Sequence, residues 1–215
     1  DGNIGTALVS RAANCAELKR QTDAGFGYYD VTNNNTTPFV RGEIWQVINT
    51  TTWKASDTLT VKNIFSYGVS KESYSFNLQG ENITRPFVIT NPGPDEGQGN
   101  QWTLSEELQL QGHTSDDSLT WQVGGYLEHS QPNGQQTQYT AILSDCKSPQ
   151  QTYTFTCSGS SIGIAHNVYF YKNYGLYAQA TYKFTDQFSV TGGIRNTWDR
   201  QREDANNITV VPSTA

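Results

Sequence analysis

One stretch, Asn173 to Trp198, constrains the fold most, because a complete structural unit can be read from it directly. Its side chains alternate between apolar and polar from Tyr174 to Phe184, and after a short polar break the alternation resumes from Phe188 to Arg195. A period of two residues is the pattern of a β-strand, whose successive side chains point to opposite faces. Two strands joined by so few residues form an antiparallel hairpin with one apolar and one polar face.

The same unit occurs at two earlier places in the chain. The segment Gly42–Lys54 is rich in β-branched and aromatic residues, and a tight break at Ala55–Asp57 separates it from the alternating run LTVKNIFSYGVS. Farther on, QWTLSEELQLQG and SLTWQVGGYLEHS alternate around a break at His113–Asp117. Asn63 and Glu106 interrupt the apolar faces of these strands with polar groups. We therefore expect three hairpins with short internal turns, separated by loops of about twenty and about forty residues.

Short turns at one end of a sheet and long loops at the other are typical of outer-membrane barrels. The lipid face of such a barrel is apolar and its lumen face is polar, and the sheet closes because backbone groups in lipid must be paired. The sequence thus predicts an all-β fold, an antiparallel up-and-down meander of about six long strands within a large transmembrane β-barrel. Trp102, Trp121, Tyr182 and Trp198 lie near strand ends, where interfacial aromatic belts form. A water-soluble sandwich is the alternative on pattern alone.

Outside the hairpins the chain carries weaker signals. Ala12–Gln21 (AANCAELKRQ) predicts a short helix within a long extracellular loop or lead-in that covers residues 1–41. Residues 42–204 hold the three hairpins, and residues 205–215 are expected to start the next loop. The sequence contains no methionine, so we expect a fragment or processed product of a longer precursor.

Charge and hydropathy argue against a nucleic-acid-binding protein and against a membrane-spanning helix. The net charge is -6, and lysine and arginine never gather into the basic run that phosphate neutralisation requires, so no nucleic-acid partner is expected. No run approaches the roughly twenty apolar residues of a membrane helix, but a barrel strand crosses with about ten alternating residues.

The cysteines predict one disulfide bond. Cys146 and Cys157 flank CKSPQQTYTFTC, whose turn and β-forming residues suit a closed loop in an oxidising compartment; two free thiols are the alternative. Cys15 is left over, either as a free thiol or with a partner outside this sequence.

Residues able to carry catalysis are scattered. His113, His129 and His166 fall on distant elements, and the chain has neither an HExxH pattern nor a GxSxG elbow. Gly124-Gly125 and Gly192-Gly193 lie inside strands without a following helix, so they relieve crowding rather than bind phosphate. We expect no enzymatic activity, no metal site and no cofactor.

Several phrases between Gly42 and Arg202 are together quite specific: SEELQLQG, VGGYLE, YAQATYKFTDQ and TGGIR. They resemble successive barrel segments of TonB-dependent outer-membrane receptors, especially the type abundant in sphingomonad-like bacteria. The resemblance implies the bacterial outer membrane, a plugged barrel of about twenty-two strands, and import of scarce nutrients such as ferric siderophores, cobalamin or oligosaccharides. It implies as partners the membrane lipid, the plug and remaining strands, the TonB complex and a small nutrient. The sequence has neither plug nor TonB motif, so the segment alone is not expected to transport.

Two sets of side chains are candidates for function in such a barrel. Aromatic residues of the second long loop are candidates for ligand capture, or else pack against each other: Tyr139, Tyr153, Phe155, Tyr169 and Tyr171. Polar strand residues are expected to face the lumen, where they line the passage, hydrogen-bond the plug, or form a wall network without ligand contact: Gln109, Gln122, Glu128, Gln179 and Arg195. The functional alternative is a secreted or surface β-sheet protein that self-associates through open strand edges into oligomers or filaments.

Overall fold

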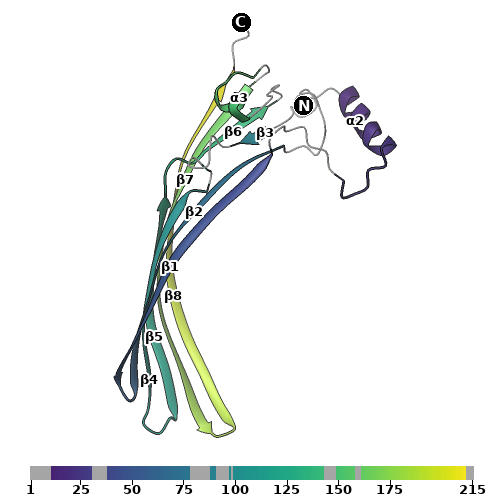
Figure 1. Cartoon of the computed structure of the whole chain (residues 1–215). Coiled ribbons are helices and arrows are strands. Elements are labelled where there is room, and N and C mark those ends of the chain that lie inside the picture. Colours follow the sequence, from purple (N-terminus) through teal and green to yellow (C-terminus); the bar gives the residue numbers. More distant parts are fainter. Residues whose placement is uncertain are drawn as a thin grey trace, which may run out of the picture.

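The structure is a computed structural model that describes residues 11–30, 38–77, 88–90, 97, 99–142, 149–157 and 161–211. Within these residues the chain forms one curved antiparallel sheet and two helices (Figure 1). The helices are α2 (Arg11–Asp23) and α3 (Pro149–Tyr153). The strands are β1 (Phe39–Ser56), β2 (Leu59–Asn77), β3 (Val88–Thr90), β4 (Gln101–His113), β5 (Leu119–Pro132), β6 (Thr137–Ile142), β7 (Ser161–Thr185) and β8 (Phe188–Val210).

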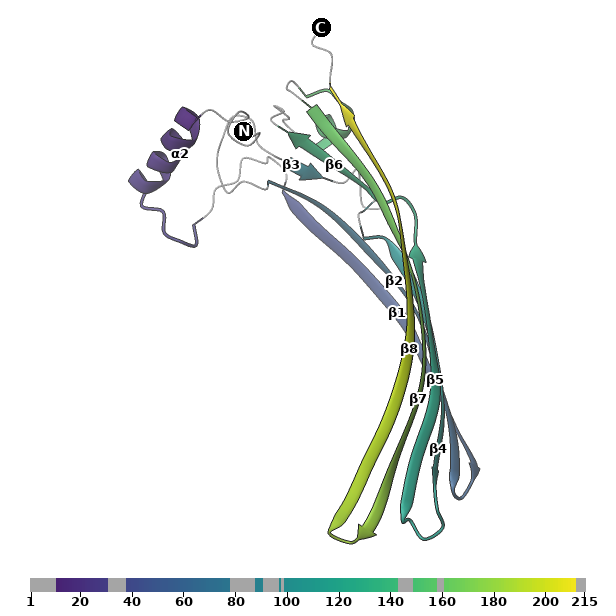
Figure 2. The same ribbon diagram turned by 180° about the vertical axis from the view of Figure 1, so that it is seen from behind.

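Six long strands follow one another across the sheet. β1 with β2, β4 with β5, and β7 with β8 form antiparallel hairpins, and β2–β4 and β5–β7 pairings join these hairpins in chain order. The three hairpin turns lie at the same end of the sheet, the lower end in Figure 1 and again in the reverse view of Figure 2. The predicted antiparallel up-and-down meander is confirmed.

Two short strands lie inside the long connections, where the sequence predicted only loops. β3 pairs with β2 and β6, and β6 pairs with β7, so the two strands continue the sheet beyond the upper ends of β4 and β5. β3 has three residues and β6 has six, which is too short for alternation to be visible among turn-forming neighbours.

The last hairpin is also longer than the alternation indicates. β7 begins at Ser161, and β8 continues to Val210, into the range expected to start the next loop. The ladder is continuous up to the pair Ile162 and Val210. The charged stretch after Trp198 remains a strand because its backbone pairs with β7 as far as Val210.

The helix predicted over Ala12–Gln21 is confirmed as α2. Arg20 pairs with Glu17 one turn earlier at 2.7 Å, the spacing that brings helix side chains together. Gly25, whose φ is 75°, follows the helix in the left-handed conformation typical of helix ends. Among the described residues, no helix is both long enough and apolar enough to cross a membrane.

Cross-strand register gives the sheet two faces of different character. Residues paired across neighbouring strands share a face, and one face, called the apolar face below, holds most of the large hydrophobic side chains. Following the register, all five tryptophans lie on it: Trp45, Trp53, Trp102, Trp121 and Trp198. The opposite, polar face carries mainly Gln, Thr, Ser, Glu, Lys and Arg.

The apolar face has no covering layer in the described part of the chain. Ile194 is 77% exposed, Trp53 63% and Leu176 60%. The buried apolar residues are few: Val69, Ala141, Cys157 and Ile162. A soluble sandwich would bury such a face against a second sheet, whereas an uncovered apolar patch of this extent calls for an apolar environment.

The turn between β4 and β5 is organised by polar contacts. Hydrogen bonds from Thr114 and Ser118 lower the pKa of Asp116 to about 2. Both ring nitrogens of His113 face backbone carbonyl oxygens, with Nδ1 3.0 Å from Thr114 and Nε2 3.1 Å from Asp57. Because only the imidazolium form donates from both nitrogens, these two carbonyls raise the pKa of His113.

Candidate functional site

The five side chains predicted to face a lumen all lie on the polar face of the sheet. Gln109 falls in the same cross-strand row as Arg195, and Gln122 in the same row as Gln179. Glu128 lies on that face nearer the long-loop end, and the hydroxyl of Tyr126 donates to it at 2.6 Å. Residues from four strands therefore meet on one surface, as the alternation alone predicts.

A hydrogen-bonded network joins the centre of the polar face. The hydroxyl of Tyr177 donates to Glu107 Oε1 at 2.5 Å and accepts from Gln122 Nε2 at 3.1 Å. Gln109 Nε2 donates to the same Glu107 oxygen at 2.9 Å, and Gln111 Nε2 donates to Gln109 Oε1 at 2.8 Å. Sequence reasoning placed Glu107 and Tyr177 on this face but did not single them out, since only the register shows that they meet.

A glycine makes room for the central tyrosine of this network. Gly124 pairs directly with Tyr177 across β5 and β7. A Cβ at Gly124 would lie 2.5 Å from the Tyr177 ring and 2.9 Å from the Leu108 carbonyl oxygen. Only a residue without a side chain allows the ring to lie across β5, so the expectation that the strand glycines relieve crowding holds at Gly124. It does not hold at Gly192, where a Cβ would meet nothing within 4 Å.

Arg195 is a cation of the polar face with few internal partners. Its Nε donates to Thr197 Oγ1 at 3.2 Å, and its guanidinium lies over Gly175, where a Cβ would be 3.3 Å from one terminal nitrogen. Among the described residues it forms no ion pair. Its remaining donors are available to groups from outside this segment.

The predicted ligand-capture aromatics do not form one cluster. Tyr169 and Tyr171 lie on the polar face near the long-loop end of β7. Tyr169 donates to Glu203 Oε1 at 3.2 Å, and this bond to a carboxylate raises the pKa of the Tyr169 hydroxyl. The Tyr171 hydroxyl accepts from Gln201 Nε2 at 3.2 Å.

The other members of that set lie farther along the sheet. Tyr139 of β6 pairs with Ile164, and its ring centroid is 6.2 Å from that of Phe155, which follows α3. The side chain of Tyr153 lies outside the described part of the structure. A role of these aromatics in ligand capture remains a prediction.

The cysteines and histidines supply no reactive centre in the described residues. Cys157 is 4% exposed and disulfide-bonded; Cys146, its predicted partner, lies outside the described residues, so that pairing stays a prediction. Cys15 is free and exposed. Within the described ranges, no group of three or more His, Cys, Asp or Glu side chains could hold a metal ion.

Aromatic side chains form two rows on the apolar face. The upper row runs across β1, β2, β4 and β5, with ring centroids 5.5 Å apart between Trp45 and Tyr67, 6.0 Å between Tyr67 and Trp102, and 5.5 Å between Trp102 and His129. The lower row lies near the hairpin turns and includes Trp53, Trp121, Tyr182, Phe184 and Phe188. Trp53 lies eight residues after Trp45, which is roughly 26 Å along the strand and, at the usual tilt, roughly 20 Å in height, approaching the height of a barrel's apolar band.

A sheet with an uncovered apolar band between two aromatic rows, a polar opposite face and short turns at one end is the wall of a transmembrane β-barrel. The family model described as TonB dependent receptor-like, beta-barrel, matches residues 3–214. The chain therefore belongs to the TonB-dependent receptor barrel family, a family of transporters and receptors located in the outer membrane of Gram-negative bacteria.

Among solved structures, the chain is similar to the ferric yersiniabactin uptake receptor FyuA from Yersinia pestis, with a TM-score of 0.49 and 12% sequence identity. The match covers 84% of this chain and 26% of that receptor, so the chain spans about a quarter of its length. No curated protein sequence matches the chain.

Proposed function

We propose that this segment forms part of the wall of an outer-membrane transporter that imports a scarce nutrient, such as a ferric siderophore, cobalamin or an oligosaccharide. Its apolar face contacts lipid. Its polar face lines the lumen and contacts a plug domain supplied by the rest of the receptor. A TonB complex acting on another part of the receptor supplies the energy.

The observation that carries the proposal is the division of the sheet into two chemically distinct faces at the level of the aromatic rows. The apolar band needs lipid to cover it, while the network around Glu107 and Tyr177 needs a wet or polar neighbour. In addition, the outer edges of β1 and β8 are unpaired in the described residues, and such edges are tolerated in lipid only when further strands close the barrel.

The network also suits a wall against which a plug moves. The side chains of this network hydrogen-bond to one another. The polar groups of the wall therefore keep hydrogen-bond partners when a contact with the plug breaks. Arg195 differs, since its side-chain hydrogen bond to Thr197 leaves further donors for a partner outside the segment. We therefore assign Arg195 to contact with the plug or with an anionic group of the nutrient.

The test is an uptake assay with the complete receptor. A strain lacking the receptor is complemented with the wild type, Arg195→Gln or the control Lys183→Gln, whose lysine pairs with Asp186 at the turn at 2.8 Å. Labelled ferric siderophores, cobalamin and oligosaccharides are supplied in turn, with and without an uncoupler. We expect energy-dependent uptake of one class, reduced by Arg195→Gln and unaffected by Lys183→Gln at equal outer-membrane levels.

The alternative function makes different predictions in the same cells. A sheet that assembles through its open edges would be recovered as water-soluble oligomers or filaments. No energy-dependent uptake of any class, together with extraction from cells without detergent, would favour that alternative over transport.

A further inference from the structure

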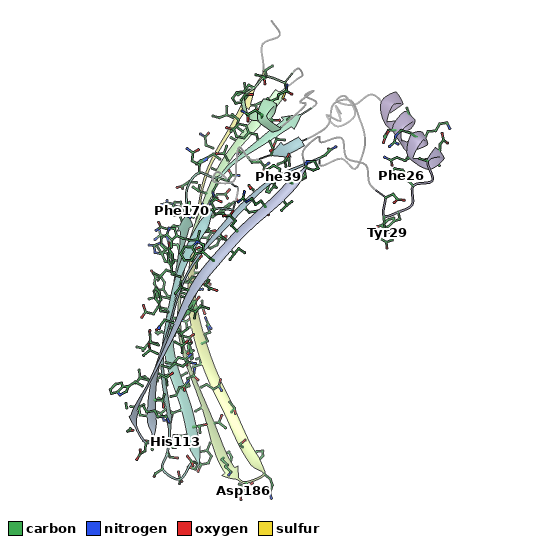
Figure 3. The ribbon with its side chains drawn as sticks, viewed as in Figure 1. Phe26, Tyr29, Phe39, His113, Phe170 and Asp186 are labelled. Carbon is green, nitrogen blue, oxygen red and sulfur yellow. The ribbon has the colours of Figure 1, made fainter. Side chains whose placement is uncertain are left out.

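A cluster of basic side chains lies on the apolar face, level with the upper aromatic row of which His129 is a member. His129, Lys172, Arg200 and Arg202 line a shallow pocket of about 290 Å³, together with Phe170 and Gln131. The register places His129, Lys172 and Arg200 in one cross-strand row over β5, β7 and β8, with Arg202 two residues farther along β8. In Figure 3, Phe170 marks this level, well above the turn residues His113 and Asp186.

Like charges are placed directly opposite one another in this cluster. Lys172 and Arg200 are cross-strand partners, a position in which two cations repel each other. Within the described residues the nearby ion pair joins Arg202 to Asp204 at 3.0 Å, and neither Lys172 nor Arg200 has a carboxylate partner. An anion held between them would relieve this repulsion.

Arg202 is held in place by a second contact besides its ion pair with Asp204. Its guanidinium carbon lies 4.1 Å from the centroid of the Phe170 ring, the geometry of a cation–π contact. Such stacking fixes the guanidinium plane and leaves edge N–H groups for planar, bidentate recognition of an anion.

An apolar groove begins immediately below the basic cluster. The next row toward the turns contains Leu127, Tyr174 and Trp198, which with Leu108, Gly125 and Leu176 line a hollow of about 550 Å³. A second hollow continues it at Val123, Ala178 and Gly192. Both are lined mainly by carbon, and small residues form their floors. Glu106 borders the upper hollow and accepts a hydrogen bond from Asn63 at 3.0 Å.

We propose that these features form one binding site for a membrane lipid with a phosphorylated headgroup. The phosphate lies between Lys172, Arg200 and Arg202, and an acyl chain lies in the groove below. The basic cluster lies toward the long loops and the apolar groove lies toward the middle of the band. A lipid would place its headgroup and its acyl chain in the same order. The inference rests on the proposed assignment of the apolar face to lipid.

The test measures which lipids stay bound to the complete receptor purified in detergent. Native mass spectrometry counts retained phosphatidylglycerol, diphosphorylated lipid A and phosphatidylcholine for the wild type, for Lys172→Gln/Arg200→Gln and for the polar-face control Lys62→Gln. Each basic group near an anionic headgroup contributes roughly fivefold in affinity. The double variant is therefore expected to bind the phosphorylated lipids about 25-fold more weakly, and the control to bind them as the wild type does.

A groove variant separates a lipid from a free anion. Gly125→Leu would place a side chain into the upper hollow, where a Cβ meets Leu176 at an ordinary 3.4 Å. We expect it to weaken lipid binding while leaving any binding of inorganic phosphate unchanged. Unchanged lipid binding, or competition by millimolar inorganic phosphate, would overturn the proposal in favour of a simple anion site. Equal retention of phosphatidylcholine, or wild-type retention by the double variant, would also overturn it.

Failure of the underlying assignment gives a separate signature. Brominated phosphatidylcholine, which carries no net headgroup charge, quenches tryptophans that contact acyl chains. Quenching of Trp198, measured against Trp198→Phe, with no headgroup preference would contradict the lipid site and keep the lipid-facing assignment. No quenching at all would contradict the assignment itself.

Discussion

A single arginine moved between adjacent residues of β7 tests which face of the sheet meets lipid. Ala178 lies on the apolar face between Val123 and Ile194, four residues from both Tyr174 and Tyr182. At about 3.3 Å per residue and the usual strand tilt, it lies roughly 10 Å from each of these aromatic residues, near the middle of the band. An arginine there costs about 2–4 kcal/mol, or roughly 30-fold to several hundredfold in the folded population.

The matched control is the next residue. Gln179→Arg introduces the same side chain at the same depth on the polar face, where Gln179 is exposed, and we expect a change within about 0.5 kcal/mol. Ala178→Leu controls for added volume, and lipid should accept it. The assay is urea unfolding of the complete receptor in phosphatidylcholine vesicles, followed by tryptophan fluorescence. Equal destabilisation by Ala178→Arg and Gln179→Arg would refute the assignment of the faces.

Three further predictions concern packing, hydrogen bonding and pH. Gly124→Ala should destabilise the receptor by about 1–3 kcal/mol because its Cβ would meet Tyr177 at 2.5 Å, whereas Gly192→Ala, with nothing within 4 Å of the new Cβ, should be neutral or slightly stabilising in the same urea titration. Tyr177→Phe should cost about 1–2 kcal/mol by removing the donor to Glu107, with little change in expression level. The pKa of His113 is raised in the folded state, so the protonated imidazole should stabilise the fold fully below about pH 6.5. This contribution should be lost as the pH rises through the raised pKa. Melting temperatures at several pH values should show the loss in the wild type and not in His113→Asn.

The alternation of single residues was enough to predict the main sheet. Runs such as Tyr174 to Phe184 fix which side chains share a face, and the register then extends that face across six strands without a break. The five residues predicted for the lumen share one face for the same reason. The period of two is a local property of a strand, so a sequence displays it directly.

Contacts that depend on register could not be read in this way. The approach of Tyr177 to Glu107 joins residues seventy positions apart, and the pairing of Lys172 with Arg200 depends on how β7 and β8 align. The aromatic set predicted for ligand capture was divided because Tyr139 belongs to a separate short strand, which pairs five positions away from Tyr169. The next loop was expected to start at residue 205, but β8 continues to Val210, because alternation does not show where a strand without an apolar side ends.

In the proposed orientation, with the long loops outside the cell, the upward extension of β7 and β8 forms part of the cell surface. Lys172 pairs with His129 of the upper aromatic row, and from Lys172 to Ile162 the hairpin continues for ten residues, which at the usual rise and tilt is roughly 25 Å of height. Ordered backbone, rather than mobile loop, therefore projects above the lipid at this side of the barrel. A bulky molecule approaching the cell, such as an antibody or a bacteriophage fibre, would meet the paired strands β7 and β8 before it reached the membrane plane.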